Sequence, residues 1–131
     1  MKSLIILAGA IVALWSISAI SETIKHPAVP TAQKTPIFLS GCILNSQCAD
    51  TSRDNLDTFI KTHPQDCALI PACAASGYSI YLPNGQLLKF TKESNEKIIS
   101  YLKSPKKNLQ VIIEATKTGI EVDLVSIKNK D

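Results

Sequence analysis

The sequence predicts a small, mainly β domain of five strands, with one helix between the third and fourth strands and a helical insertion between the first and second. Three observations support this fold class. Apolar and polar residues alternate, as in half-buried strands, along two pairs of segments that are each joined by a turn sequence. A segment with apolar residues at helical spacing separates the two pairs. An apolar run of strand length precedes them all and is followed by a polar stretch that contains cysteines.

The first expected strand covers residues 37–44, an apolar run bounded by Pro36 and Asn45. Gly41 stands in its middle. Glycine inside a strand often marks a bulge or a bend, so we expect one of these at Gly41.

The insertion, residues 45–77, is expected to be helical but irregular. Residues 50–62 carry apolar side chains at helical spacing, with Asp54 as a plausible N-cap, which predicts one short amphipathic helix. Pro71 excludes a regular helix through the second half of the insertion. Gly77 suits the position just after a helix end.

The first predicted hairpin joins residues 78–82 and 86–90 through Asn84 and Gly85, which both accept positive φ. A helix of about ten residues is expected after Thr91, because acidic residues lie in its first turn and an apolar stripe follows.

Residues 109–115 and 120–127 form the second predicted hairpin, with the turn at Gly119. The alternation slips at Leu124-Val125, which indicates a bulge near the end of the last strand.

Residues 1–21 read as a secretory signal: one lysine, then an apolar run, then small residues before Glu22. The alternative is an uncleaved membrane anchor through residues 3–21, which are just long enough to span a bilayer. Residues 22–36 contain three prolines among polar residues and predict an extended tether before the domain at 37–128. These features predict a periplasmic or secreted protein, membrane-anchored only if the first segment is retained.

The four cysteines of the 131-residue chain all lie within or beside the insertion, at Cys42, Cys48, Cys67 and Cys73. In an exported domain of this size, four cysteines favour two disulfides, and three connectivities are possible. We expect bridges that join the 42/48 pair to the 67/73 pair, because these would tie the insertion to the first strand. The alternative is a zinc or copper site drawn from Cys48, His63, Cys67 and Cys73, since thiolate and imidazole suit those metals.

The predicted element order resembles the OB-fold, a small five-stranded Greek-key barrel, over residues 37–128. The chain also resembles small secreted bacterial domains of unassigned function. The residues that carry this second resemblance are Ser40-Gly41-Cys42-Ile43, Asn45-Ser46-Gln47-Cys48, Cys67-Ala68, Gly77-Tyr78 and Asn84-Gly85. The first resemblance implies a small barrel; the second implies a fold and an exported location, and brings no known activity.

No nucleophile elbow, phosphate loop or haem motif is present in the sequence, so it favours a non-catalytic binding or accessory module of the cell envelope without a cofactor. Its partner would be a small molecule, a peptide or an envelope protein. The binding residues we predict are Tyr81, Leu87 and Lys89, which alternate outward on the first hairpin.

An alternative function is single-stranded nucleic-acid binding through Tyr78, Tyr81 and Phe90, as in other OB-like barrels. The formal net charge of only +3 and the expected export argue against it.

Overall fold

The computed structural model describes residues 34–131. The predicted signal segment 1–21 lies outside the described residues, as does most of the predicted tether 22–36. Among the residues described, no helix has the length and apolar character needed to cross a bilayer.

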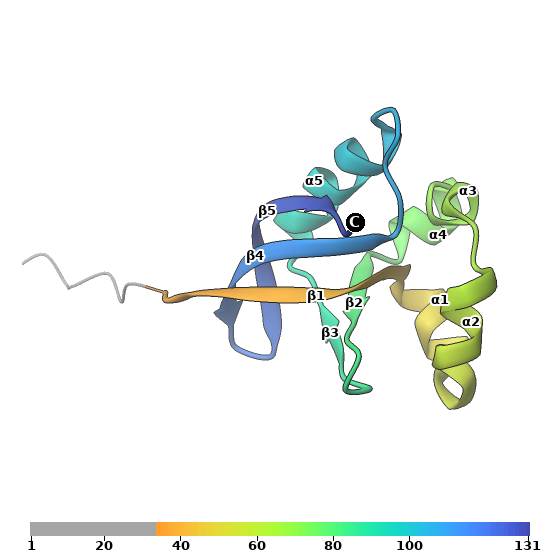
Figure 1. The fold of residues 1–131 in the computed structure, drawn as a ribbon, viewed down its shortest axis with the longest axis horizontal. Helices are drawn as coiled ribbons and strands as arrows, with labels where there is room; N and C mark the ends of the chain where they lie inside the picture. The colour runs from red at the N-terminus through yellow and green to blue at the C-terminus, as the bar shows by residue number, and fades with distance from the viewer. Residues whose placement is uncertain (1–33) are drawn as a thin grey trace, which may run out of the picture. The chain divides into compact units, whose positions relative to one another are not determined.

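Five antiparallel strands form one sheet in the order β3-β2-β1-β4-β5 (Figure 1). The predicted number of strands and their order along the chain are confirmed. The strands are β1 (Pro36–Asn45), β2 (Tyr78–Tyr81), β3 (Leu87–Lys89), β4 (Gln110–Thr118) and β5 (Glu121–Asn129). The long β1 lies at the centre, paired with β2 near its C-terminal end and with β4 along its N-terminal part.

The predicted closure into a barrel is wrong, because the sheet stays open between β3 and β5. These edge strands meet at one isolated parallel bridge, between Phe90 and Val122, where the Thr91 N–H donates to the Val122 carbonyl at 2.9 Å. The strand β3 has only three residues, which is too short to add a ladder with β5.

The insertion between β1 and β2 contains several short helices, and the single helix expected over residues 50–62 is divided among three of them. They are α1 (Ser46–Thr51), a 3-10 helix (Arg53–Asn55), α2 (Leu56–Thr62), α3 (Gln65–Ala68) and α4 (Pro71–Ala75). Asp54 lies within the 3-10 helix, and Asn55 occupies the N-cap of α2 without a side-chain capping bond. Pro71 begins α4, as expected of a residue that suits only the first helical turn, and Gly77 follows α4 at φ 81°.

The predicted helix between the third and fourth strands is α5 (Lys92–Lys103), which packs against β5. Its buried Ser94 joins the two elements through its hydroxyl. The Leu124 N–H donates to Ser94 Oγ at 2.7 Å, and Ser94 Oγ donates to the Asp123 carboxylate at 3.0 Å. These two hydrogen bonds, one buried and one partly buried, therefore fix the first turn of α5 on β5.

The hydrophobic core lies between the sheet and α5 and continues under the insertion. Its fully buried members come from β1, β2, β4, β5 and α5, and include Ile43, Leu44, Ile80, Ile98, Leu102, Val111, Ile113 and Leu124. Figure 1 shows the insertion helices gathered beyond the C-terminal end of β1, with α5 near β5.

The predicted bulge in the last strand is confirmed at Val125. Glu114 pairs with Ser126 and Ala115 pairs with Leu124, so Val125 is the unpaired extra residue. Its side chain is half exposed, as an extra residue that leaves the ladder would be.

Gly41 does not form the predicted bulge, because the ladder between β1 and β4 runs through it without a register shift. A Cβ at this position would lie 2.3 Å from the Tyr81 carbonyl oxygen and 2.9 Å from Ile80 Cγ1. Glycine is needed here because the backbones of β1 and β2 approach so closely.

We predict that Gly41→Ala lowers the free energy of unfolding by about 1–3 kcal/mol, because the added methyl must displace backbone. Urea denaturation would measure the loss. The control is Ser40→Ala at the neighbouring position, whose Oγ is buried without a hydrogen-bond partner, so that its removal should cost little. Equal midpoints for Gly41→Ala and wild type would contradict the steric argument.

We also predict that Ser94→Ala costs about 1–3 kcal/mol, because the Leu124 N–H then loses its partner in a buried position. Ser100→Ala, on an exposed position of the same helix, is the matched control. The same denaturation measurement applies, and hydrogen exchange at Leu124 should rise in the first variant only.

Candidate functional site

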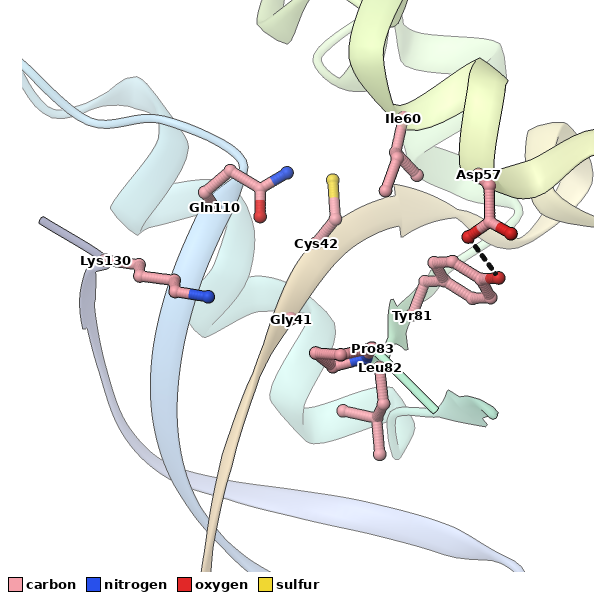
Figure 2. A pocket seen from close by; sticks show the side chains of 9 residues that line it. All are labelled: Gly41, Cys42, Asp57, Ile60, Tyr81, Leu82, Pro83, Gln110 and Lys130. Carbon is pink, nitrogen blue, oxygen red and sulfur yellow. Dashed lines mark hydrogen bonds between the residues drawn. The ribbon is translucent and has the colours of Figure 1, made fainter. Parts of the chain in front are cut away.

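A hollow of about 160 Å³ opens between the sheet and α2 (Figure 2). Its lining residues are Gly41, Cys42, Asp57, Ile60, Tyr81, Leu82, Pro83, Gln110 and Lys130. We call it the β1 pocket. It is smaller than the roughly 300–1,000 Å³ of pockets that hold drug-sized ligands, so it suits a small molecule or one group of a larger one.

The pairing register of the strands brings together the residues on the sheet side of the β1 pocket. Cys42 pairs with Tyr81 of β2 on one side and with Gln110 of β4 on the other. The Lys130 N–H donates to the Gln110 carbonyl at 2.9 Å, which places Lys130 next in the row. Four side chains that are far apart in sequence thus become neighbours across adjacent strands.

The helix α2 supplies one wall through Asp57 and Ile60. The Tyr81 hydroxyl donates to the Asp57 carboxylate at 2.8 Å, as the dashed line in Figure 2 shows. This hydrogen bond raises the pKa of Tyr81, and burial and the Asp57 charge raise it further. The phenol is therefore a neutral donor near pH 7, and it connects the insertion to the sheet.

The Cys42 side chain points into the β1 pocket between Gln110 and Ile60 (Figure 2), yet only 1% of the residue is exposed. Burial raises the pKa of this thiol from 9.0 to about 11. A thiol with so high a pKa carries almost no thiolate near neutrality, so it is a poor nucleophile there.

Hydrogen-bond donors and a carboxylate face each other across the β1 pocket. The Lys130 ammonium and the Gln110 amide lie on the β4–β5 side, and Asp57 lies on the α2 side. Leu82 and Pro83 add apolar surface. The arrangement offers donors to an anionic or carbonyl oxygen beside an apolar contact.

Of the three predicted binding residues, only Tyr81 lines the β1 pocket. It is 92% buried rather than outward-facing, because α2 covers it. Leu87 is the cross-strand partner of Tyr81 and is half-buried, and Lys89 pairs with Ser79 and is exposed on the hairpin.

The predicted disulfides are not formed in the structure: no two sulfur atoms among the described residues lie at bonding distance. Cys42 lines the β1 pocket, whereas Cys48, Cys67 and Cys73 lie on α1, α3 and α4 of the insertion. The expected bridge from Cys42 to the 67/73 pair therefore has its two ends at different sites.

The alternative metal set is not assembled either. Within residues 34–131, no group of three or more histidine, cysteine or acidic side chains has a geometry that could hold a metal ion. His63 stacks on Phe59 with ring centroids 4.7 Å apart, and its Nε2 is buried without a hydrogen-bond partner. Burial lowers the pKa of His63, so the imidazole is neutral near pH 7.

The aromatic residues considered for base stacking lie in the core or under α2. Tyr78 and Phe90 are almost fully buried, as is Tyr81. A stacking surface for nucleic acid needs exposed rings, which these three do not provide.

Comparison of the chain with protein-family models, curated proteins and solved structures finds no match. The site is therefore interpreted from its own geometry.

Sequence reasoning did not place Gln110, Lys130 or Asp57 in a site with Cys42. Gln110 and Lys130 reach Cys42 only through strand register. The one available signal was the polar Gln110 at the start of β4, next to an apolar run. Such a residue is too common to identify a site.

We predict that Cys42 makes stability fall between pH 9 and pH 11. Because folding raises the pKa of this thiol, the folded state holds its proton more tightly. The contribution of this thiol to the free energy of unfolding is roughly 2 kcal/mol. It is complete below about pH 9 and is lost as pH rises through about 11. Urea unfolding at several pH values under reducing conditions measures this.

The comparison is with Cys42→Ala, which is less stable at every pH but should show a shallower decline over this range. Parallel stability curves for the two proteins would show that Cys42 is not the titrating group.

Proposed function

We propose that this chain is an exported, non-catalytic binding or accessory module that takes a small ligand, or one group of a larger partner, into the β1 pocket. The observation that carries the proposal is the row of Tyr81 on β2, Cys42 on β1, Gln110 on β4 and Lys130 just after β5, with α2 as the adjoining wall. Export rests on the signal-like residues 1–21.

The non-catalytic part of the proposal follows from the state of the pocket's groups. The Cys42 thiol is held protonated by burial. The Asp57 carboxylate already accepts the Tyr81 hydroxyl, so its place is structural. A catalytic site would need an activated nucleophile or a free general base here.

The ligand class we propose is a small molecule or chain end with a carboxylate or similar oxyanion. Lys130 provides the pocket's positive charge and Gln110 a second donor on the same side. Charge-assisted hydrogen bonds of this kind are stronger than neutral ones. Leu82 and Pro83 would contact the ligand's apolar part.

The strand order also supports an OB-like arrangement as the scaffold. In the described residues β3 and β5 approach each other in parallel at Phe90 and Val122, the two edges whose pairing would complete a barrel. Ligand contacts on such a scaffold come from a sheet face and the connections beside it, which is where the β1 pocket lies.

The proposal is tested by titrating the purified chain with acetate and succinate while backbone amide resonances are followed by NMR. We expect saturable shifts at Cys42, Tyr81 and Gln110. Lys130→Ala should weaken the fitted affinity by roughly tenfold or more, because a charge-assisted bond is lost.

Acetamide, which has the same shape as acetate without its charge, serves as the ligand control. Lys117→Ala, at an exposed position of β4 away from the pocket, serves as the protein control and should bind as wild type does. Absence of saturable shifts with any carboxylate, or equal losses in both lysine variants, would refute the proposed ligand class.

A further inference from the structure

Three of the four cysteines lie on neighbouring short helices of the insertion, apart from the β1 pocket. Cys48 lies on α1 and Cys73 on α4, two helices that contact each other, and Cys67 lies on α3, which also contacts α4. Each of the three is partly exposed. We call Cys48, Cys67 and Cys73 the thiol cluster.

Backbone contacts hold the first pair of the thiol cluster in place. The Ser46 N–H donates to the Gly77 carbonyl at 2.9 Å, and the Gln47 N–H donates to Ser76 Oγ at 3.2 Å. Ser76 Oγ in turn donates to the Cys73 carbonyl at 2.6 Å. These bonds join the start of α1 to the end of α4, so they hold together the two helices that carry Cys48 and Cys73.

The third thiol is positioned through its neighbour, Ala68. The Asn45 side-chain amide donates to the Ala68 carbonyl at 3.1 Å, and the Tyr78 hydroxyl donates to it at 2.7 Å. Both donors are buried residues of the paired ends of β1 and β2. The base of the sheet thereby fixes α3, and Cys67 with it.

Burial raises the pKa of the Cys48 thiol, and the neighbouring Cys73 and Cys67 raise it further. Negative charge is thus disfavoured at Cys48. Forming a disulfide removes two ionisable thiols from the thiol cluster and leaves a neutral bond.

We propose that Cys48 and Cys73 are a disulfide-forming pair and that Cys67 is a resident third thiol able to exchange with their bridge. The bridge would connect the first and last helices of the insertion. Cys42 takes no part, because it lies in the β1 pocket, whose lining includes none of the other three cysteines.

The oxidant is a disulfide donor such as oxidised glutathione. The Cys73 thiolate attacks one donor sulfur and expels the other as a thiolate, which leaves a mixed disulfide. Cys48 then loses its proton, attacks the Cys73 sulfur and expels the second donor thiolate. The two cysteines lose two protons and two electrons, and the donor is reduced to two thiols. In the thiol–disulfide exchange that we propose for Cys67, its thiolate attacks one sulfur of the bridge and releases the other sulfur as a thiolate.

The pairing is tested in the full chain equilibrated with reduced and oxidised glutathione, by thiol counting and mass spectrometry after acid quenching. Cys42→Ser/Cys67→Ser should form an internal bridge and retain no free thiol. The matched control Cys48→Ser/Cys73→Ser, which keeps the same number of cysteines, should form no internal bridge and retain both thiols. Wild type should retain two thiols, at Cys42 and Cys67.

The third thiol is tested in Cys48→Ser, where Cys67 should replace the missing partner and bridge to Cys73. Circular dichroism confirms folding, and peptide mapping of the wild type gives the answer if a variant does not fold. A bridge that contains Cys42, four thiols that stay reduced, or stoichiometric zinc or copper bound with four reduced thiols would each overturn the proposal. Failure of carboxylate binding at the β1 pocket would leave this result untouched.

Discussion

The close approach of β1 and β2 at Gly41 is the constraint on which the rest of the structure depends. β1 is the central strand, and at Gly41 it passes so near the Tyr81 carbonyl that a side chain has no room. One residue further on, Cys42 pairs with strands on both sides. Because a slip of one residue would turn every side chain to the opposite face, this register decides which groups meet in the β1 pocket.

The insertion starts and ends at one place in the sheet, because Asn45 at the end of β1 pairs with Tyr78 at the start of β2. Both side chains donate to the same carbonyl, that of Ala68. A stretch of short helices with little core of its own is thus held by buried hydrogen bonds from the sheet. In such a segment polar contacts and covalent links matter more than area, since short helices bury little apolar surface.

Local patterns were enough to predict the strands, the bulge at Val125 and the helix break at Pro71, because alternation, phase slips and proline act over a few residues. The subdivision of residues 50–62 was missed because no single residue there forbids a continuous helix. The site was missed for another reason. Gln110 and Tyr81 meet Cys42 only through pairing between distant strands, which periodicity does not encode. Closure of the barrel failed because β3 is too short, and strand length is what sequence patterns define least well.

The β1 pocket and the thiol cluster are separate sites, yet one element connects them. The helix α2 provides Asp57 and Ile60 to the pocket wall, and it lies in sequence between Cys48 and Cys73. Any bridge between those cysteines encloses α2 in a closed loop, and a closed loop has fewer accessible conformations than an open one. The hydrogen bond from Tyr81 to Asp57 fixes the same helix to the sheet. Oxidation of Cys48 and Cys73 would therefore restrict how far α2 can move away from the pocket, although neither cysteine lines the pocket.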